Sequence, residues 1–253
     1  MQPVSQSGNE LRLDERVAIV TGAAGGLGEA IAGLLAERGA SVVVVDLRED
    51  ELQATLADIQ EKGGSAQAIS GSVADAETAR RSVTACLDTW GRVDILVNNA
   101  GIAGRHAPVW EFSDEEWEEM MAVNARGTFN FLRAALPSMI ERKWGRVVNI
   151  ASIAAKEGVP GTALYTTSKA GIIGMTKVVA KEVALHGILV NAVTPGPFDT
   201  PIRKRPGGDP ALIEAVATRI PLGRIGEPRE MAQLVGFLAS TEMTYTTGSP
   251  LGV

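Results

Sequence analysis

Residues 17–36 read VAIVTGAAGGLGEAIAGLLA and join a short apolar run, a glycine-rich turn and a helical pattern. A strand, a glycine turn and a helix in this order are typical of the first unit of a dinucleotide-binding sheet. Gly22, Gly26 and Gly28 let the backbone turn tightly and approach a pyrophosphate, which then faces the positive end of the helix. A P-loop is the competing phosphate site, but no Gly-Lys-Ser/Thr follows the glycines.

Strands and helices are expected to alternate along the whole chain. Strands are predicted at 17–20, 41–45, 66–70, 93–97, 147–150 and 188–193, with a weak strand in the closing TGSPLGV, and helices at 49–62, 75–90, from Ser113, from Thr162 and at 227–239. The pattern predicts a single-domain α/β protein over residues 1–253: a Rossmann-like, doubly wound parallel sheet of about seven strands with helices on both faces. Residues 1–13 are expected to form a flexible N-terminal tail, and residues 197–220 a loop that closes over the substrate.

Asp46 ends the second predicted strand, close to the distance beyond the glycines at which a carboxylate meets the adenosine ribose. A carboxylate accepts hydrogen bonds from both ribose hydroxyls and repels a 2′-phosphate. The alternative is that Asp46 caps the helix that starts near Arg48. Arg48 is a cation two residues further on and complicates the preference for NAD over NADP. Ala23 and Ala24, however, place no cation inside the glycine turn. The sequence therefore favours NAD, and NADP less.

Tyr165 and Lys169 lie one helical turn apart, so their side chains share a face. A cation held beside a phenol favours the phenolate, and we expect it to lower the pKa of Tyr165. Ser152 follows the preceding strand, and the loop between them is long enough to return its hydroxyl to the phenol. A hydroxyl, a phenol and an amine form a proton-transfer set for interconverting an alcohol and a carbonyl. The alternative is a surface tyrosine beside a snorkelling lysine.

Amides follow the fourth predicted strand and occur again in the next helix. In Asn98-Asn99-Ala100-Gly101, two amides and a glycine can bond neighbouring backbone and leave a flat floor for a cofactor. Ser113 and Glu116 form a capping-box pattern at the start of that helix. Asn124 lies further along it, where a buried amide needs partners; either a packing bond or a held water would serve.

Composition narrows the class of protein. Charged residues make up 21% and hydrophobic residues 45% of the 253 residues, and the net charge is −6. An acidic chain is not expected to bind nucleic acid. One cysteine and two histidines favour a reducing compartment and argue against a zinc site, so no metal is expected. The first residues are polar, and no apolar run is long enough to span a bilayer. We expect a soluble, cytoplasmic protein that does not associate with membranes.

Together these motifs resemble those of the short-chain dehydrogenase/reductase superfamily over Val17 to Val253. The resemblance implies a catalytic tetrad of Asn124, Ser152, Tyr165 and Lys169. Ser152 would polarise the substrate oxygen and Tyr165 would transfer the proton. Lys169 would hold the nicotinamide ribose and lower the Tyr165 pKa, and Asn124 would position a water in a proton relay. Hydride would pass between the alcohol carbon and the nicotinamide, without a metal.

The expected cofactor site is larger than the glycine turn. It consists of Gly22, Gly26, Leu27, Gly28, Asp46, Leu47, Ser72, Val73, Asn99, Ala100, Gly101, Tyr165, Lys169, Pro195, Gly196, Phe198 and Thr200. Two features depart from the family pattern. Ser72 stands where relatives usually carry an aspartate beside the adenine, and the chain stops at Val253 where relatives commonly continue through a Gly-Gly segment. The family implies a homotetramer formed through the helices around 113–136 and 163–187.

The motifs leave three functions open. The first is an NAD-dependent oxidoreductase acting on a secondary alcohol such as a sugar, polyol or hydroxy acid. The second is a 3-oxoacyl-thioester (acyl-carrier-protein) reductase, and the third is a non-catalytic nucleotide sensor. For either enzyme we expect the substrate to be a small alcohol or ketone, which the third function would not have. Arg203, Lys204 and Arg205 form either a solvated charge cluster or, through Arg203, a clamp for an anionic substrate.

Overall fold

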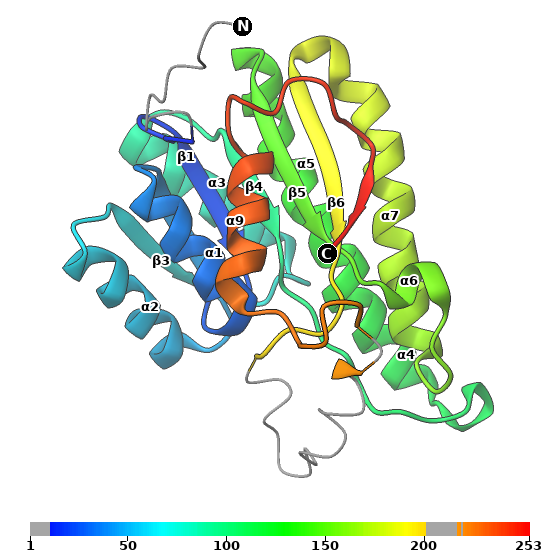
Figure 1. Cartoon of the computed structure of the whole chain (residues 1–253). Coiled ribbons are helices and arrows are strands. Elements are labelled where there is room, and N and C mark those ends of the chain that lie inside the picture. Colours follow the sequence, from blue (N-terminus) through cyan, green and yellow to red (C-terminus); the bar gives the residue numbers. More distant parts are fainter. Residues whose placement is uncertain (1–10, 201–216, 219) are drawn as a thin grey trace, which may run out of the picture.

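A parallel sheet of seven strands forms the centre of the molecule (Figure 1). The computed structural model describes residues 11–200, 217–218 and 220–253. The strands are β1 Val17–Thr21, β2 Ser41–Asp46, β3 Ala66–Ser70, β4 Ile95–Asn98, β5 Gly145–Ile150, β6 Ile188–Thr194 and β7 Pro250–Gly252. They lie in the order β3-β2-β1-β4-β5-β6-β7. The predicted Rossmann-like sheet is therefore confirmed.

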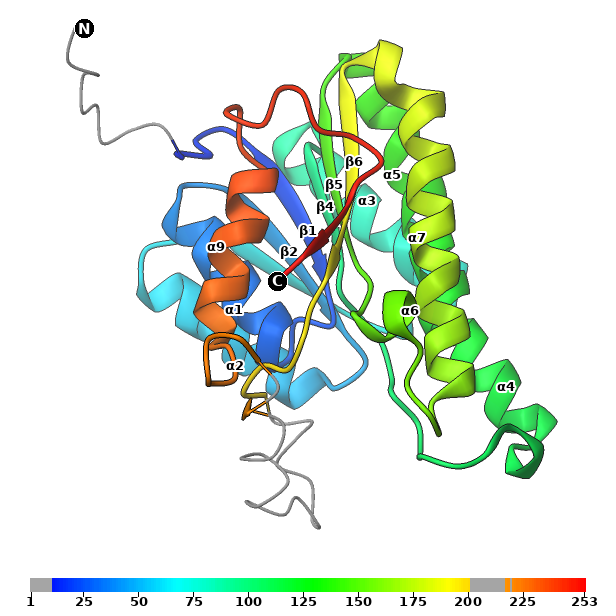
Figure 2. The ribbon, with the colours of Figure 1, turned by 45° about the vertical axis from the view of Figure 1, so that its right-hand side comes forward.

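Helices cover both faces of the sheet, as Figure 2 shows. The helices are α1 Gly26–Glu37, α2 Glu49–Glu61, α3 Ala76–Trp90, α4 Asp114–Met120, α5 Gly127–Arg142, α6 Ala154–Glu157, α7 Ala163–Val183 and α9 Pro228–Leu238, with 3-10 turns at Val109–Glu111 and Ala184–His186. Buried side chains of α1, α2 and α9 pack on one face, and those of α3, α5 and α7 on the other.

The two apolar clusters follow from the alternation of side chains along each strand. In β1, Ala18 and Val20 face the α1 side, whereas Val17 and Ile19 face the α3 side. All five residues of β1 are buried, which explains why the strand is a continuous apolar run rather than an alternating pattern. The sequence therefore specifies a strand with helices on both sides.

The order of the strands reverses between β1 and β4. From β1 the chain runs outward through β2 to β3 and then returns to β4 on the other side of β1. Because every pair is parallel, the carboxyl ends of the strands meet at one edge of the sheet. Ligands of such sheets bind in the crevice at this reversal. The site is therefore expected between the ends of β1 and β4.

A capping box starts α4 as predicted, with Ser113 Oγ accepting from Glu116 N and the Glu116 carboxylate accepting from Ser113 N. The expected single helix from Ser113 is interrupted, however, by a π-helical turn at Met121–Arg126. Such turns insert a residue into the α-helical ladder and often occur at functional sites. Here the turn holds Asn124, so the correction bears directly on the candidate site.

Leu13 belongs to the folded domain, whereas the sequence predicts that it is part of the N-terminal tail. Its side chain is buried, and its N–H donates to Arg38 O at 2.7 Å. The boundary of the domain therefore lies before Leu13, because an apolar side chain there packs against α1. Within the described part of the chain, no helix is both long and apolar enough to cross a membrane.

Candidate active site

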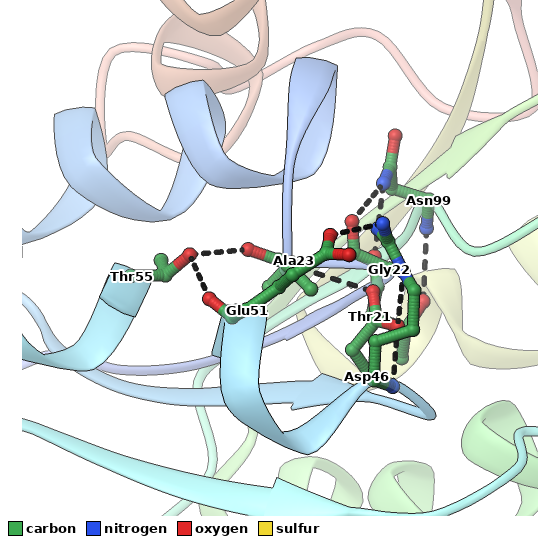
Figure 3. Close-up of polar contacts among 9 residues, drawn as sticks. Thr21, Gly22, Ala23, Asp46, Glu51, Thr55 and Asn99 are labelled. Carbon is green, nitrogen blue, oxygen red and sulfur yellow. Dashed lines mark hydrogen bonds and ion pairs between the residues drawn. The ribbon is translucent and has the colours of Figure 1, made fainter. Parts of the chain in front are cut away.

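The glycine turn packs directly against the end of β4. Asn99 Nδ2 donates to Thr21 O at 3.0 Å and to Gly22 O at 3.1 Å, as Figure 3 shows. A Cβ at Gly28 would overlap Gly22 O and lie 2.5 Å from Asn99 Nδ2. Only glycine therefore permits α1 to start this close to the turn. The predicted amide floor and the predicted glycine turn form one unit.

The turn ends in a helix start that suits an anion. Gly25 is the N-cap residue of the 12-residue helix α1, and no side chain caps its first-turn N–H groups. These N–H groups have no partner inside the helix, and the helix dipole is positive there. Leu27 packs against the core beneath. The residues present therefore fit the pyrophosphate of a dinucleotide.

Asp46 joins the end of β2 to the glycine turn. Its Oδ2 accepts from Ala24 N at 3.0 Å and its Oδ1 accepts from Arg48 N at 3.1 Å. Asp46 is not the N-cap residue of α2, because that position is Arg48, whose side chain makes no capping hydrogen bond. Leu47 is exposed at the rim next to it. The carboxylate therefore lies beside the glycine turn, at the end of β2.

Ser72 and Val73 lie in the turn between β3 and α3. Ser72 Oγ accepts from Ala74 N at 3.3 Å, and Asn130 Nδ2 donates to Val73 O at 3.0 Å. The buried Val73 side chain lies against Gly127 at the start of α5. The serine that replaces the usual aspartate therefore hydrogen-bonds within its own turn. Contacts with Gly127 and Asn130 of α5 hold that turn in position.

Tyr165, Ser152 and Lys169 converge at the ends of β5 and α7. Tyr165 is hydrogen-bonded to Ser152, whose Oγ also accepts from Ala154 N at 3.2 Å. Lys169 is buried, and its Nζ donates to Ile150 O at 2.8 Å. Burial lowers the pKa of Lys169 to about 8. The alternative of a surface tyrosine beside a snorkelling lysine is therefore wrong.

The prediction that the Tyr165 pKa is lowered is wrong in direction. Burial of the phenol raises the pKa of Tyr165, and the hydrogen bond with Ser152 opposes this rise. Lys169 Nζ lies 5.9 Å from the centroid of the Tyr165 ring and bonds to the backbone instead. Desolvation of the phenolate therefore outweighs the attraction of a cation at that distance.

Asn124 is completely buried in the π-helical turn. Its Oδ1 accepts from Ile102 N at 2.8 Å, and its Nδ2 donates to Ile102 O at 3.0 Å and to Ser168 Oγ at 2.9 Å. These are packing bonds, one of the two roles that the sequence left open. A Cβ at Gly101 would lie 3.0 Å from Asn124 Oδ1 and 3.1 Å from Lys169 Nζ. The side chains of Asn124 and Lys169 thus both line Gly101.

Three hydroxyls that support the site were not predicted. Thr21 Oγ1 accepts from Asn99 N at 3.0 Å and Ala100 N at 3.1 Å. Ser168 Oγ accepts from Asn124 and donates to Tyr165 O at 2.8 Å. Thr55 Oγ1 donates to Ala23 O at 3.0 Å. The sequence position of Thr21, at the end of a buried strand and just before the glycines, could have indicated its role. Ser168 and Thr55 occur in ordinary helical patterns that give no such indication.

The loop after β6 lies against β7 and the start of α6. Pro195 O accepts from Ile153 N at 3.0 Å, and Gly196 N donates to Val253 O at 2.9 Å. Phe198 is buried and forms a β-bridge with Gly226. Thr200 is the last described residue before 201–216, so Arg203, Lys204 and Arg205, with most of the predicted closing loop, lie outside the described residues.

Comparison with known proteins decides the family. A family model described as "Enoyl-(Acyl carrier protein) reductase", of the short-chain dehydrogenase/reductase type, matches residues 22–253. The chain belongs to the short-chain dehydrogenase/reductase superfamily. It is 39% identical to the 3-oxoacyl-(acyl-carrier-protein) reductase FabG of Thermotoga maritima over 243 residues, which cover 96% of this chain and 98% of the relative.

Two further relatives are close to the short-chain dehydrogenase/reductase described here. The 2-dehydro-3-deoxy-L-rhamnonate dehydrogenase (NAD(+)) of Sphingomonas sp. strain SKA58 is 41% identical over 234 residues, 92% of each chain. The crystal structure of levodione reductase superposes with a TM-score of 0.92 at 32% identity, covering 96% of this chain and 97% of that one. The protein is therefore an NAD(P)-dependent oxidoreductase that acts on CH–OH groups, as the motifs predicted.

Proposed function

We propose that this short-chain dehydrogenase/reductase uses NAD to interconvert a secondary alcohol, such as a sugar, polyol or hydroxy acid, and its ketone. The observation that supports NAD is the Asp46 carboxylate at the end of β2, held beside the glycine turn by Ala24 N at 3.0 Å. A fixed negative charge there disfavours a 2′-phosphate and accepts hydrogen bonds from ribose hydroxyls. The relative from Sphingomonas, whose name specifies NAD and a sugar acid, supports the same choice.

In this proposal Tyr165 exchanges the proton with the substrate oxygen. The raised pKa keeps the phenol protonated near neutral pH, so Tyr165 is ready to donate when a ketone is reduced. In the oxidation of an alcohol the same phenol must first lose its proton. Ser152 is hydrogen-bonded to Tyr165 and lies just after β5, so its hydroxyl orients the substrate oxygen toward the phenol.

Lys169 and Asn124 are proposed to support the proton transfer. Lys169 is buried with a pKa of about 8, so its ammonium form is poised to release and regain a proton near neutrality. Asn124 fixes the backbone of Ile102 and the hydroxyl of Ser168. The amide thereby holds the π-helical turn in place. In this proposal the backbone of that turn binds the water of the proton relay.

A bound nicotinamide would supply or accept the hydride. The residues proposed to hold the coenzyme are the glycine turn at its pyrophosphate, Asp46 and Leu47 at its ribose, Ser72 and Val73 at its adenine, and Asn99, Ala100, Gly101, Tyr165, Lys169, Pro195, Gly196, Phe198 and Thr200 towards its nicotinamide.

A 3-oxoacyl-(acyl-carrier-protein) reductase is the second candidate function. It is favoured by the relatives of that name, at 39% identity in Thermotoga maritima and 40% in Vibrio cholerae. The two candidates differ in the group beside the carbonyl, a hydroxylated chain in one and a thioester in the other. They share the proton-transfer residues, so a test must vary the substrate.

The test is a panel of matched substrates with NAD(H) and NADP(H), followed at the absorbance of the reduced nicotinamide. The panel pairs sugar acids and their neutral polyol analogues with a 3-oxoacyl thioester. Turnover of the hydroxylated compounds with NAD supports the first candidate, and turnover of the thioester alone transfers the assignment to the second.

A separate experiment tests the predicted anion clamp. Arg203→Ala is assayed on matched acidic and neutral alcohols, and the clamp requires a selective loss of kcat/KM on the acidic alcohol.

We further propose that the protein is a homotetramer. Phe129 on α5 and Val178 on α7 are exposed apolar side chains on the helices that the family expectation names. Burial of such side chains against a second copy removes apolar surface from water. Light scattering with size-exclusion chromatography gives the mass directly, and Val178→Asp should lower it. An unmodified protein that elutes as a monomer contradicts the proposal.

A further inference from the structure

A cation lies at the mouth of the glycine turn although the turn itself contains none. The nearest Arg48 nitrogen, Nη2, is 3.8 Å from the position that a Cβ at Gly25 would occupy. Arg48 Nε lies 3.6 Å from Asp46 Oδ1. If the coenzyme binds as proposed above, this guanidinium lies beside the ribose. A free arginine there would suit a 2′-phosphate, because its planar fork binds phosphate oxygens well.

The guanidinium is not free, however. Arg48 Nη1 is hydrogen-bonded and ion-paired to Glu51 Oε2, one turn along α2. Asp46 Oδ1 contacts the same guanidinium at its Nε. The three side chains carry one positive and two negative charges, so their sum is −1. Figure 3 shows Glu51 and Asp46 around the glycine turn.

The backbone that carries Glu51 is fixed to the turn. Thr55 Oγ1, on the next turn of α2, donates to Ala23 O at 3.0 Å, and Leu52 is buried in the core. The side chains of Arg48 and Glu51 are themselves about half exposed, at 55% and 53%. An exposed ion pair contributes little to the free energy of unfolding, and salt screens it. The main effect of the Arg48–Glu51 pair is therefore on the net charge that a bound ligand meets.

We propose that Glu51 is a specificity-determining residue, which disfavours NADP by holding Arg48 in an ion pair beside the glycine turn. The inference rests on the proposed coenzyme site. With Glu51 ionised, a 2′-phosphate meets a net negative group whose only guanidinium is already paired. With Glu51 neutral, the charges of Asp46 and Arg48 cancel, and Arg48 Nη1 is released for the phosphate while Nε stays beside Asp46.

The test compares the dissociation constants of NADH and NADPH, measured by calorimetry on the unmodified protein and on Glu51→Gln. Glutamine keeps the shape and removes the charge. We expect the Kd for NADPH to fall about 5- to 30-fold, which corresponds to about 1–2 kcal/mol of binding free energy. The Kd for NADH should change much less, because NADH has no 2′-phosphate. The gain should shrink at high salt.

Two controls isolate the pair. Asp50→Asn removes the same charge from the first turn of α2 without touching the pair, and it should leave the NADPH to NADH ratio unchanged within about twofold. Adding Arg48→Gln to Glu51→Gln should abolish the gain. An unchanged ratio in Glu51→Gln, or an equal gain in Asp50→Asn, overturns the role of Glu51. Failure of the unmodified protein to bind NADH instead overturns the proposed function, so the two failures are distinct.

Discussion

The two ends of the candidate site are built from different kinds of interaction. Around Tyr165, the polar groups are buried and bonded inside the fold: Lys169 to Ile150 O, and Asn124 to Ile102 and Ser168. At the rim between β2 and α2, Arg48 and Glu51 are half exposed and are joined by charge. Buried hydrogen-bond networks fix the geometry of the side chains. Exposed charges change the electrostatic potential and have little effect on the stability of the fold. The comparison implies that reaction chemistry and coenzyme choice can be altered separately.

Tyr165→Phe tests the buried end and should have the largest effect. It removes the transferable proton and little volume, so we expect kcat to fall by ~10²–10⁴ while NADH affinity is retained. Steady-state rates and calorimetry measure the two quantities. The matched control is Tyr245→Phe, since Tyr245 is the only other tyrosine and is 99% exposed. A near-normal kcat in Tyr165→Phe would remove tyrosine from the proposed chemistry.

Lys169→Met should lower both rate and NADH affinity while making the fold more stable at neutral pH. Burial lowers the pKa of Lys169 from 10.5 to about 8, so the unfolded chain binds more protons between these values. Stability of the unmodified protein therefore rises with pH through that window, and the burial penalty is full below pH 8. We expect the variant to gain about 1–2 kcal/mol in unfolding free energy at pH 7.

The stability gain of Lys169→Met should shrink as the pH is raised from 8 towards 10. Denaturant unfolding at several pH values measures it. Lys177→Met, at an exposed position of the same helix, is the control and should show no such dependence. A variant less stable than the unmodified protein at pH 7 would mean that the bond to Ile150 O outweighs the cost of burying the charge.

Asp46→Ser addresses the exposed end with a smaller expected effect. Loss of the carboxylate relieves repulsion of a 2′-phosphate, so the preference for NAD over NADP should narrow about tenfold. The same change removes an acceptor for Ala24 N and Arg48 N, and we expect a stability loss of about 1 kcal/mol. Kinetics with both coenzymes and unfolding curves measure these effects. An unchanged preference would exclude Asp46 from ribose recognition.

Much of this architecture could be predicted because its signals are local. The glycine spacing, the apolar runs and the capping box at Ser113 each depend on residues close in sequence. The π-helical turn could not be predicted, since MAVNAR has the composition of an ordinary helix. The direction of the Tyr165 pKa also depends on burial by distant segments. The Arg48–Glu51 pair has helical spacing, but the position of Arg48 near Gly25 depends on how two separate elements pack.

We propose that the carboxylates of Asp46 and Glu51 make this enzyme NAD-dependent, while the buried groups perform the chemistry. The most direct measurement is kcat/KM of the unmodified protein for NAD and NADP, on one alcohol that it oxidises at low ionic strength. We expect NAD to be preferred by about tenfold or more. An equal or greater kcat/KM with NADP would contradict the roles of Asp46 and Glu51, and would favour the 3-oxoacyl-(acyl-carrier-protein) reductase candidate.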